Sequence, residues 1–316
     1  MSKILVTGGA GFIGSHLVDE LIKKGHRVTV VDNLSTGKKS FVNSQAVFYK
    51  QDVTLASLAK VFKKARPDLV FHLAAQKSVG FSVSHPAEDA RINIGGSLNV
   101  IDNCLAAGVK KFIFISTGGA IYGEARQIPT PETTAEKPDS PYGLSKLAID
   151  NYLEKFYNRV KKLNYVSLRL ANVYGPRQDP FGEAGVIAVF ASNLLKKKPC
   201  HINGSGRQTR DFVYVSDVVS ACLKAAGRGR GAYNIATARE ISINELYQKL
   251  ADIFKSRPAK HYPALPGEVF RSSLNYQKAK KVLGWQPKVT LEQGIEQTIE
   301  YFRGCGPARH NNESVG

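Results

Sequence analysis

A glycine-rich turn near the N-terminus is the feature that most constrains the fold of this chain. The apolar run at residues 4–7 leads directly into Gly9-x-Gly11-x-x-Gly14, and an amphipathic stretch of helix length follows over residues 12–24. This order leaves backbone N–H groups and the positive end of a helix dipole free to bind a pyrophosphate. Tight turns also need glycine for backbone reasons alone. The triplet therefore predicts a dinucleotide site only together with other residues.

Asp32 supplies the second part of that prediction. It ends the next apolar strand, 18 residues after Gly14. A carboxylate at this point accepts hydrogen bonds from the ribose 2′-OH and repels a 2′-phosphate. The sequence therefore favours NAD over NADP, although Lys38 and Lys39 just downstream partly offset the repulsion.

Short apolar strands alternate with amphipathic stretches through the first half of the chain, which predicts an α/β fold with a doubly wound, Rossmann-type parallel sheet. Beyond Arg169, loops rich in Gly and Pro predict a second, smaller α+β domain that binds substrate. The expected strands are residues 4–7, 28–31, 47–49, 69–73, 111–116, 165–169 and 233–236, and the expected helices are residues 12–24, 55–65, 86–107, 141–161, 242–254, 276–283 and 291–302. The expected domains are residues 1–170 with a return segment at 211–238, residues 171–210 with 239–303, and a disordered tail at 304–316.

The formal net charge of +18 raises the question of polyanion binding. The basic residues form short runs that are spread over the chain, with no basic tail and no interleaved aromatics. We therefore expect a generally basic surface that attracts anionic small molecules, and no specific nucleic-acid partner.

The four cysteines, Cys104, Cys200, Cys222 and Cys305, lie far apart, without a C-x-x-C pair or a histidine at ligand spacing. Disulfide bonds and a metal site are both disfavoured. No segment resembles a signal peptide or reaches the roughly 18 apolar residues of a membrane-spanning helix. These features predict a cytoplasmic protein with no membrane association.

Tyr142 and Lys146 lie four positions apart on an expected helix and so share one of its faces. An ammonium group beside a phenol stabilises the phenolate, which makes the tyrosine usable as a base. Ser116 and Thr117 end the preceding strand, at the sheet edge where doubly wound folds bind ligands. A hydroxyl group there can hydrogen-bond the substrate oxygen that Tyr142 deprotonates.

Several segments together resemble the extended short-chain dehydrogenases and, within them, the UDP-glucose 4-epimerases, including those that accept N-acetylated sugars. The resemblance covers about residues 1–303. It rests on Thr7-Gly8-Gly9-Ala10-Gly11-Phe12-Ile13-Gly14, Val31-Asp32-Asn33-Leu34, His72-Leu73-Ala74-Ala75, Pro141-Tyr142-Gly143-Leu144-Ser145-Lys146 and Arg210-Asp211-Phe212-Val213-Tyr214-Val215.

The resemblance implies an NAD cofactor, a UDP-sugar substrate and a homodimer in which the helices at 86–107 and 141–161 pair. It implies three catalytic residues, Thr117, Tyr142 and Lys146. It places the cofactor at Gly8, Gly11, Phe12, Ile13, Gly14, Asp32, Asn33, Asp52, Val53, Leu73, Ala74, Ala75, Gln76, Asn93, Ser116, Tyr142, Lys146 and Ala171, and the substrate at Asn172, Gly185, Val186, Arg210, Arg271 and Ser272.

Two departures from the family pattern concern the substrate. Leu265 stands where the family usually has a phosphate-binding arginine, for which Arg271 is the expected substitute, and Asn203 stands where many epimerases have an aromatic residue. Ser272 occupies the position whose bulk decides whether an N-acetyl group fits. These residues predict that UDP-GlcNAc and UDP-GalNAc are accepted as well as UDP-Glc and UDP-Gal.

The reaction implied is epimerisation at C4 through a transient 4-keto sugar. Related dehydratases carry acidic residues directly after the strand-end threonine, whereas this chain has Gly118 and Gly119. Dehydration therefore lacks its extra acid and base. The alternatives are a uronic acid epimerase, a 4-keto reductase or a non-catalytic NAD sensor, and the presence of Tyr142 and Lys146 argues against the sensor.

Overall fold

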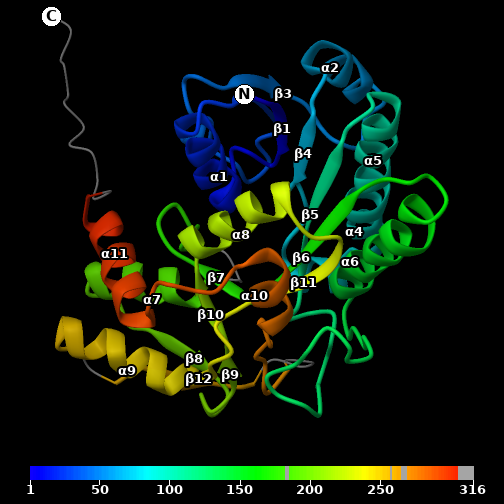
Figure 1. The fold of residues 1–316 in the computed structure, drawn as a ribbon. Helices are drawn as coiled ribbons and strands as arrows, with labels where there is room; N and C mark the ends of the chain where they lie inside the picture. Colours follow the sequence, from blue (N-terminus) through cyan, green and yellow to red (C-terminus); the bar gives the residue numbers. More distant parts are fainter. Residues whose placement is uncertain (182–184, 257, 265–268, 305–316) are drawn as a thin grey trace, which may run out of the picture.

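One large parallel sheet carries helices on both faces, and a smaller group of helices and short strands lies below it in Figure 1. The computed structural model describes residues 1–181, 185–256, 258–264 and 269–304. The sheet has the strand order β11-β6-β5-β4-β1-β2-β3, and each neighbouring pair is parallel. Its strands are β1 (Lys3–Thr7), β2 (Arg27–Asp32), β3 (Val47–Lys50), β4 (Leu69–His72), β5 (Lys111–Thr117), β6 (Tyr165–Leu170) and β11 (Gly231–Ile235). The predicted Rossmann-type sheet is confirmed, and its strand ends differ from the expected ones by one or two residues.

Successive strand residues point to opposite faces of the sheet and are buried in two separate cores. Ile4 and Val6 pack with α1 and α8, whereas Leu5 packs with α2, α5 and α6. Both faces are therefore covered, as the continuous apolar strands require. These helices are α1 (Phe12–Lys23), α2 (Leu58–Ala65), α5 (Ser97–Ala106), α6 (Pro141–Asn151) and α8 (Val215–Gly227).

The two long helices that were expected at residues 86–107 and 141–161 each contain a wider, π-helical segment. The first consists of α4 (Pro86–Ala90), a π segment at Arg91–Gly96 and α5. The second consists of α6 and a π segment at Tyr152–Asn158. Both run on without a break, so the expected helices are confirmed with this local change in winding.

Three helices were not among those expected. α8 occupies much of a segment that was interpreted only as a return strand, and α3 (Val79–Ser84) is a short helix in an expected loop. α7 (Val186–Leu195) reads Val-Ile-Ala-Val-Phe at its start, a composition that favours strands. Six of its ten residues are buried, so tertiary packing overrides local propensity there.

The smaller group packs around Leu246 and Ile295, with α7 against both α9 (Ile243–Phe254) and α11 (Leu291–Gly304). α10 (Gln277–Leu283) packs against α8 and β11. The short strands pair as β7 (Asn172–Tyr174) with β10 (Phe212–Tyr214), β8 (His201–Asn203) with β13 (Lys260–Tyr262), and β9 (Thr209–Arg210) with β12 (Ile241–Ser242). The division into domains stays a prediction. Gly304 ends α11, and the rest of the expected tail lies outside the described residues.

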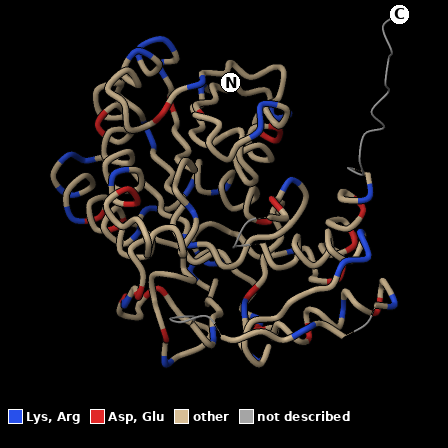
Figure 2. The backbone as a smooth tube through the Cα atoms, turned by 180° about the vertical axis from the view of Figure 1, so that it is seen from behind, with Lys and Arg blue, Asp and Glu red and all other residues tan. Residues whose placement is uncertain are grey.

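Basic residues occur along most of the chain and do not gather on one element (Figure 2). This distribution fits the generally basic surface that the sequence predicted. Within the described ranges, no helix has the length and apolar character needed to cross a membrane.

Candidate functional site

The glycine-rich turn joins β1 to α1 at the carboxyl edge of the sheet, beside the turn that follows β4. A Cβ on Gly14 would lie 2.1 Å from the Gly8 carbonyl oxygen, and one on Gly8, whose φ is +70°, would lie 2.6 Å from the Ala74 backbone nitrogen. Only glycine permits these approaches. Gly11 caps α1 without a side-chain hydrogen bond, so the N–H groups of the first turn face outward. The turn therefore fits a pyrophosphate, and Phe12, Ile13 and Gly14 are the first residues of α1.

Asp32 lies at the end of β2 and is only 7% exposed. Its carboxylate accepts hydrogen bonds from the backbone N–H groups of Ala10, at 3.0 Å, and Leu34, at 2.8 Å. It is thereby fixed beside the glycine-rich turn, where a ribose would follow the pyrophosphate. The Lys39 ammonium lies 3.6 Å from the centroid of the Phe48 ring, so this lysine is engaged by an aromatic face.

Asn33 and Asp52 connect the ends of β2 and β3. The Asn33 amide donates a hydrogen bond of 2.9 Å to Asp52, whose other oxygen accepts from Thr54. Burial acts to raise the pKa of Asp52, but the hydrogen bonds from Thr54 and Asn33 lower it overall. Val53 follows, with its carbonyl oxygen bonded to Asn99 at 2.7 Å.

His72 ends β4 as a buried structural residue. Its Nδ1 lies 2.6 Å from Thr7 Oγ1 and its Nε2 lies 2.9 Å from Ser97 Oγ. Burial, with a smaller effect of the Lys146 charge, lowers the pKa of His72 to about 3. His72 is therefore neutral in the working range and acts as a hydrogen-bonded link between strands and helices.

The segment Leu73-Ala74-Ala75-Gln76 follows β4 and is held by Asn93. The Asn93 side chain accepts a hydrogen bond from the Gln76 backbone N–H and donates one to the Gln76 carbonyl oxygen, both at 3.0 Å. Thr7 Oγ1 accepts from the Ala74 N–H at 3.2 Å. Asn93 is only 2% exposed, so it supports this segment from behind.

Tyr142 and Lys146 lie in the first turns of α6, which packs closely against the loop after β5. A Cβ on Gly143 would lie 2.4 Å from the Ala120 carbonyl oxygen, so glycine allows this approach. The Lys146 ammonium donates to the Ile115 carbonyl oxygen at 3.0 Å and lies 5.9 Å from the centroid of the Tyr142 ring. The structure thus brings the expected pair together beside the end of β5.

The pKa of Tyr142 differs from the expectation that the ammonium group of Lys146 lowers it. Burial, reinforced by the charge of Asp89, raises the pKa of Tyr142 instead of lowering it. Burial lowers the pKa of Lys146 to about 8, although Asp150 and Asp89 oppose this change. Lys146 alone therefore does not make Tyr142 a phenolate, because desolvation outweighs an ammonium group at this separation.

The two hydroxyl groups at the end of β5 have different surroundings. Ser116 is buried and its Oγ lies 3.4 Å from Asp150 Oδ2, whereas Thr117 is half-buried at the strand end. Thr117 is therefore the better placed of the two to meet a substrate oxygen. Ala171 follows β6, the neighbouring strand, and its N–H donates to the Ile235 carbonyl oxygen at 3.0 Å.

The expected substrate residues lie on separate elements. Asn172 begins β7, Arg210 ends β9, and Gly185 and Val186 begin α7. Arg271 is ion-paired with Glu240 at 2.5 Å, so its guanidinium is already held by a carboxylate. Leu265 lies outside the described residues.

Ser272 is fixed beside the catalytic strand end. Its Oγ lies 3.8 Å from a Cβ built on Gly119. The next residues, Ser273 and Leu274, donate hydrogen bonds of 3.0 and 3.3 Å to the buried carboxylate of Asp211. Leu274 also occupies the space beside Gly118, where a Cβ would lie 2.2 Å from its Cδ1.

The sequence reasoning missed three buried residues that support the site. Ser82 accepts a hydrogen bond from the Tyr142 backbone N–H at 3.1 Å, Asp89 accepts from Ser145 at 2.7 Å, and Asp150 lies behind Ser116. Asp89 lies four positions before Asn93, a helical spacing that was available as a signal. Ser82 lies in α3, which gave no signal.

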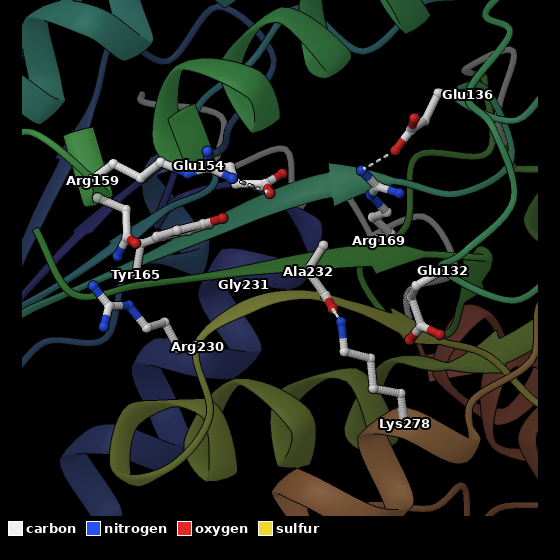
Figure 3. Close-up of a pocket in the computed structure, with 11 residues that line it drawn as sticks. Glu132, Glu136, Glu154, Arg159, Tyr165, Arg169, Arg230, Gly231, Ala232 and Lys278 are labelled. Carbon is white, nitrogen blue, oxygen red and sulfur yellow. Dashed lines mark hydrogen bonds and ion pairs between the residues drawn. The ribbon is translucent and has the colours of Figure 1, made fainter. Parts of the chain in front are cut away.

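A polar pocket of about 430 Å³ lies apart from these residues, along β6 and β11 (Figure 3). Arg169 lies at its inner side and pairs with Glu136 at 2.9 Å, while Lys278 donates to the Ala232 carbonyl oxygen at 2.8 Å. No predicted cofactor, catalytic or substrate residue lines this pocket.

The Rossmann sheet, the glycine-rich turn and the Tyr142–Lys146 pair are those of a dinucleotide-dependent enzyme that transfers a hydride. The chain belongs to the NAD dependent epimerase/dehydratase family, whose model matches residues 4–236. The enzyme therefore uses NAD, which the geometry of the glycine-rich turn fits.

Solved structures agree with this assignment. The UDP-glucose 4-epimerase of Thermotoga maritima, solved with UDP-glucose, is 51% identical, with a TM-score of 0.94 and 96% and 99% of the two chains covered. The Thermus thermophilus enzyme of the same name, in complex with NAD, is 42% identical, with a TM-score of 0.91 and coverage of 95% and 99%. The UDP-N-acetylglucosamine 4-epimerase of Methanobrevibacter ruminantium is 35% identical, with a TM-score of 0.91 and coverage of 96% and 99%.

Replacing Gly14 with alanine tests the glycine-rich turn. We expect Gly14→Ala to purify with less than about a tenth of the bound NAD, since the added Cβ displaces the Gly8 carbonyl and the start of α1. Bound NAD is measured after acid release. Gly227→Ala is the control, because a Cβ there meets nothing within 4 Å. Equal NAD content in both variants would contradict this role.

Proposed function

We propose that this chain interconverts the C4 epimers of UDP-hexoses, UDP-Glc with UDP-Gal, through a transient 4-keto sugar. The observation that carries the proposal is the Tyr142–Lys146 pair placed at the end of β5, with glycines in the two positions after Thr117. The similarity to UDP-glucose 4-epimerases over 96% of the chain supports the UDP-sugar as substrate.

In this mechanism Tyr142 removes the O4 proton and Thr117 hydrogen-bonds the same oxygen. NAD, held by the glycine-rich turn and Asp32, would supply the hydride acceptor and donor for C4, and its positive charge would favour the Tyr142 phenolate. Lys146, held by the Ile115 carbonyl, adds a second positive charge below its pKa of about 8. Tyr142 then returns the proton to O4.

The surroundings of Gly118 support epimerisation over dehydration. Leu274 fills the space that any side chain at position 118 would need. An acid or base therefore has no room directly after Thr117. With no acid or base at position 118, the 4-keto sugar is reduced again, and the reaction returns to a hexose without net oxidation.

The first test is incubation of the purified holoenzyme with UDP-Glc, without added reductant, followed by separation of the products. We expect UDP-Gal to appear, and Tyr142→Phe to lower kcat by about 10²- to 10⁴-fold, because the base is removed. Tyr262→Phe, at an exposed tyrosine, is the control. Unchanged UDP-Glc with NAD bound would contradict the proposed substrate.

We infer that N-acetylated sugars are accepted as well. Ser272 is small, and its Oγ lies 3.8 Å from a Cβ built on Gly119, so a small side chain stands beside the end of β5 on this side. The similarity to a UDP-N-acetylglucosamine 4-epimerase supports this inference.

The variant Ser272→Tyr tests the sugar preference. We expect kcat/KM for UDP-GlcNAc to fall at least about 100-fold, while the value for UDP-Glc changes less than about threefold, because the larger side chain fills only the N-acetyl space. Both sugars are compared in one preparation. Equal losses on the two sugars would argue that Ser272 does not face the N-acetyl group.

We also propose a homodimer that works in the cytoplasm. Exposed apolar side chains occur at intervals of eight and then four residues on the helix that begins with α6, which lies at the edge of the molecule in Figure 1. This apolar stripe comprises Leu144, Tyr152 and Phe156, and the exposed Val160 lies in the turn that follows the helix. A stripe of this length on an outer helix is suited to pairing with a second copy.

The thiols of Cys104, Cys200 and Cys222 are free, which fits a reducing compartment.

The variant Phe156→Glu tests the dimer. We expect it to sediment as a monomer at micromolar concentration, because a carboxylate in the middle of an apolar interface is desolvated without a partner. Ile253→Glu, at an exposed position on α9, is the matched control and retains the wild-type mass. Dimers in both variants would place the interface elsewhere.

A further inference from the structure

Asp89 is a buried carboxylate at the meeting point of the cofactor segment and the catalytic helix. The side chain is 0% exposed. Its Oδ1 accepts hydrogen bonds from Gln76 Nε2 at 2.8 Å and from Asn93 Nδ2 at 2.9 Å. Its Oδ2 accepts a bond of 2.7 Å from the hydroxyl of Ser145, which lies directly before Lys146 in α6. One carboxylate thus joins three segments that are far apart in the sequence.

We propose that Asp89 is a positioning residue for the Tyr142–Lys146 pair, acting through its bond to Ser145 and through its negative charge. The inference rests on the proposed epimerase activity and adds a residue that does not touch the substrate. Asp89 fixes the rotation of α6 relative to the segment that ends in Gln76. It also places a negative charge near Tyr142 and Lys146, whose ionisation the reaction needs.

The other buried carboxylate near Lys146 is already neutralised. Asp150 is ion-paired with Arg169 at 2.9 Å, and Arg169 continues to Glu136 at the polar pocket (Figure 3). The hydrogen-bond donors of Asp89 are uncharged amide and hydroxyl groups. Asp89 acts on both members of the pair, whereas Asp150 acts on Lys146 alone and has the larger effect there.

The titratable groups that face the pair come from three elements. Asp150 on α6 and, to a smaller extent, Asp89 on α4 raise the pKa of Lys146, and Asp89 also raises that of Tyr142. His72 on β4, with its pKa lowered to about 3, stays neutral. Asp89 therefore helps Asp150 to keep Lys146 in its ammonium form near neutral pH, and it makes Tyr142 less acidic.

The variant Asp89→Asn removes the charge with little change in shape. Deprotonation of Tyr142 sets the acid limb of the kcat profile, and deprotonation of Lys146 sets the alkaline limb. Because Asp89 raises both pKa values, we expect both limbs to move to lower pH, by about one unit. The ratio of activity at pH 9 to activity at pH 6.5 therefore falls, and the KM for UDP-Glc changes less than about twofold, because Asp89 is remote from the sugar.

Two further variants separate charge from position. Ser145→Ala removes one hydrogen bond and retains the carboxylate, so we expect kcat to fall about two- to tenfold with no displacement of the pH profile. Glu88→Gln removes an exposed charge from the neighbouring residue of α4 and should leave the profile in place. All variants are measured as holoenzymes, with NAD content and thermal midpoint checked first.

Each outcome decides one part of the proposal. An Asp89→Asn profile that overlies the wild-type profile, with only a lower kcat or thermal midpoint, would overturn the electrostatic role. Wild-type kcat in Ser145→Ala would overturn the positioning role, and this variant remains informative if Asp89→Asn does not fold. A wild-type holoenzyme that does not epimerise UDP-Glc would instead refute the proposed function.

Discussion

Burial of both faces of the seven-stranded sheet is the constraint on which the rest of the structure depends. A parallel strand with apolar residues on both sides, such as Leu5-Val6 in β1, must be covered by helices from above and below. The chain satisfies this with α1 on one face, then α2, α5 and α6 in succession on the other, and finally α8 on the first face. All seven carboxyl ends then meet at one edge, so Thr7, Asp32, His72 and Thr117 share an edge without any local signal that relates them.

Much of this arrangement could be predicted from sequence, because its signals are local. The glycine triplet, Asp32 and the spacing of Tyr142 from Lys146 each report a backbone or helical requirement that holds whatever the tertiary structure. The helices α7 and α8 could not be assigned in this way. The start of α7 carries strand-favouring residues, and it is helical because of what it packs against.

The electrostatics of the site were the hardest part to predict, since they depend on desolvation and on partners distant in sequence. The i, i+4 spacing places an ammonium near the phenol, but the raised pKa of Tyr142 comes from burial and from Asp89, 53 positions earlier in the chain. Arg271, expected as a phosphate ligand, is paired with Glu240, a contact between two segments whose order in the sequence gives no hint of it. The pKa values of groups in such a site also depend on the charge of the bound cofactor.

The π-helical segment after α6 has a consequence for the shape of the outer surface. In an α-helix, four residues turn the chain through about 400°, so side chains spaced by four drift about 40° around the axis at each step. Looser winding over Tyr152–Asn158 reverses this drift. The apolar side chains of Tyr152 and Phe156 can therefore stay nearly in line with the axis, while Leu153 and Tyr157 remain turned to the core. Deleting one residue from this segment would restore ordinary winding and twist the line away from any flat partner, with the catalytic turns of α6 upstream left in place.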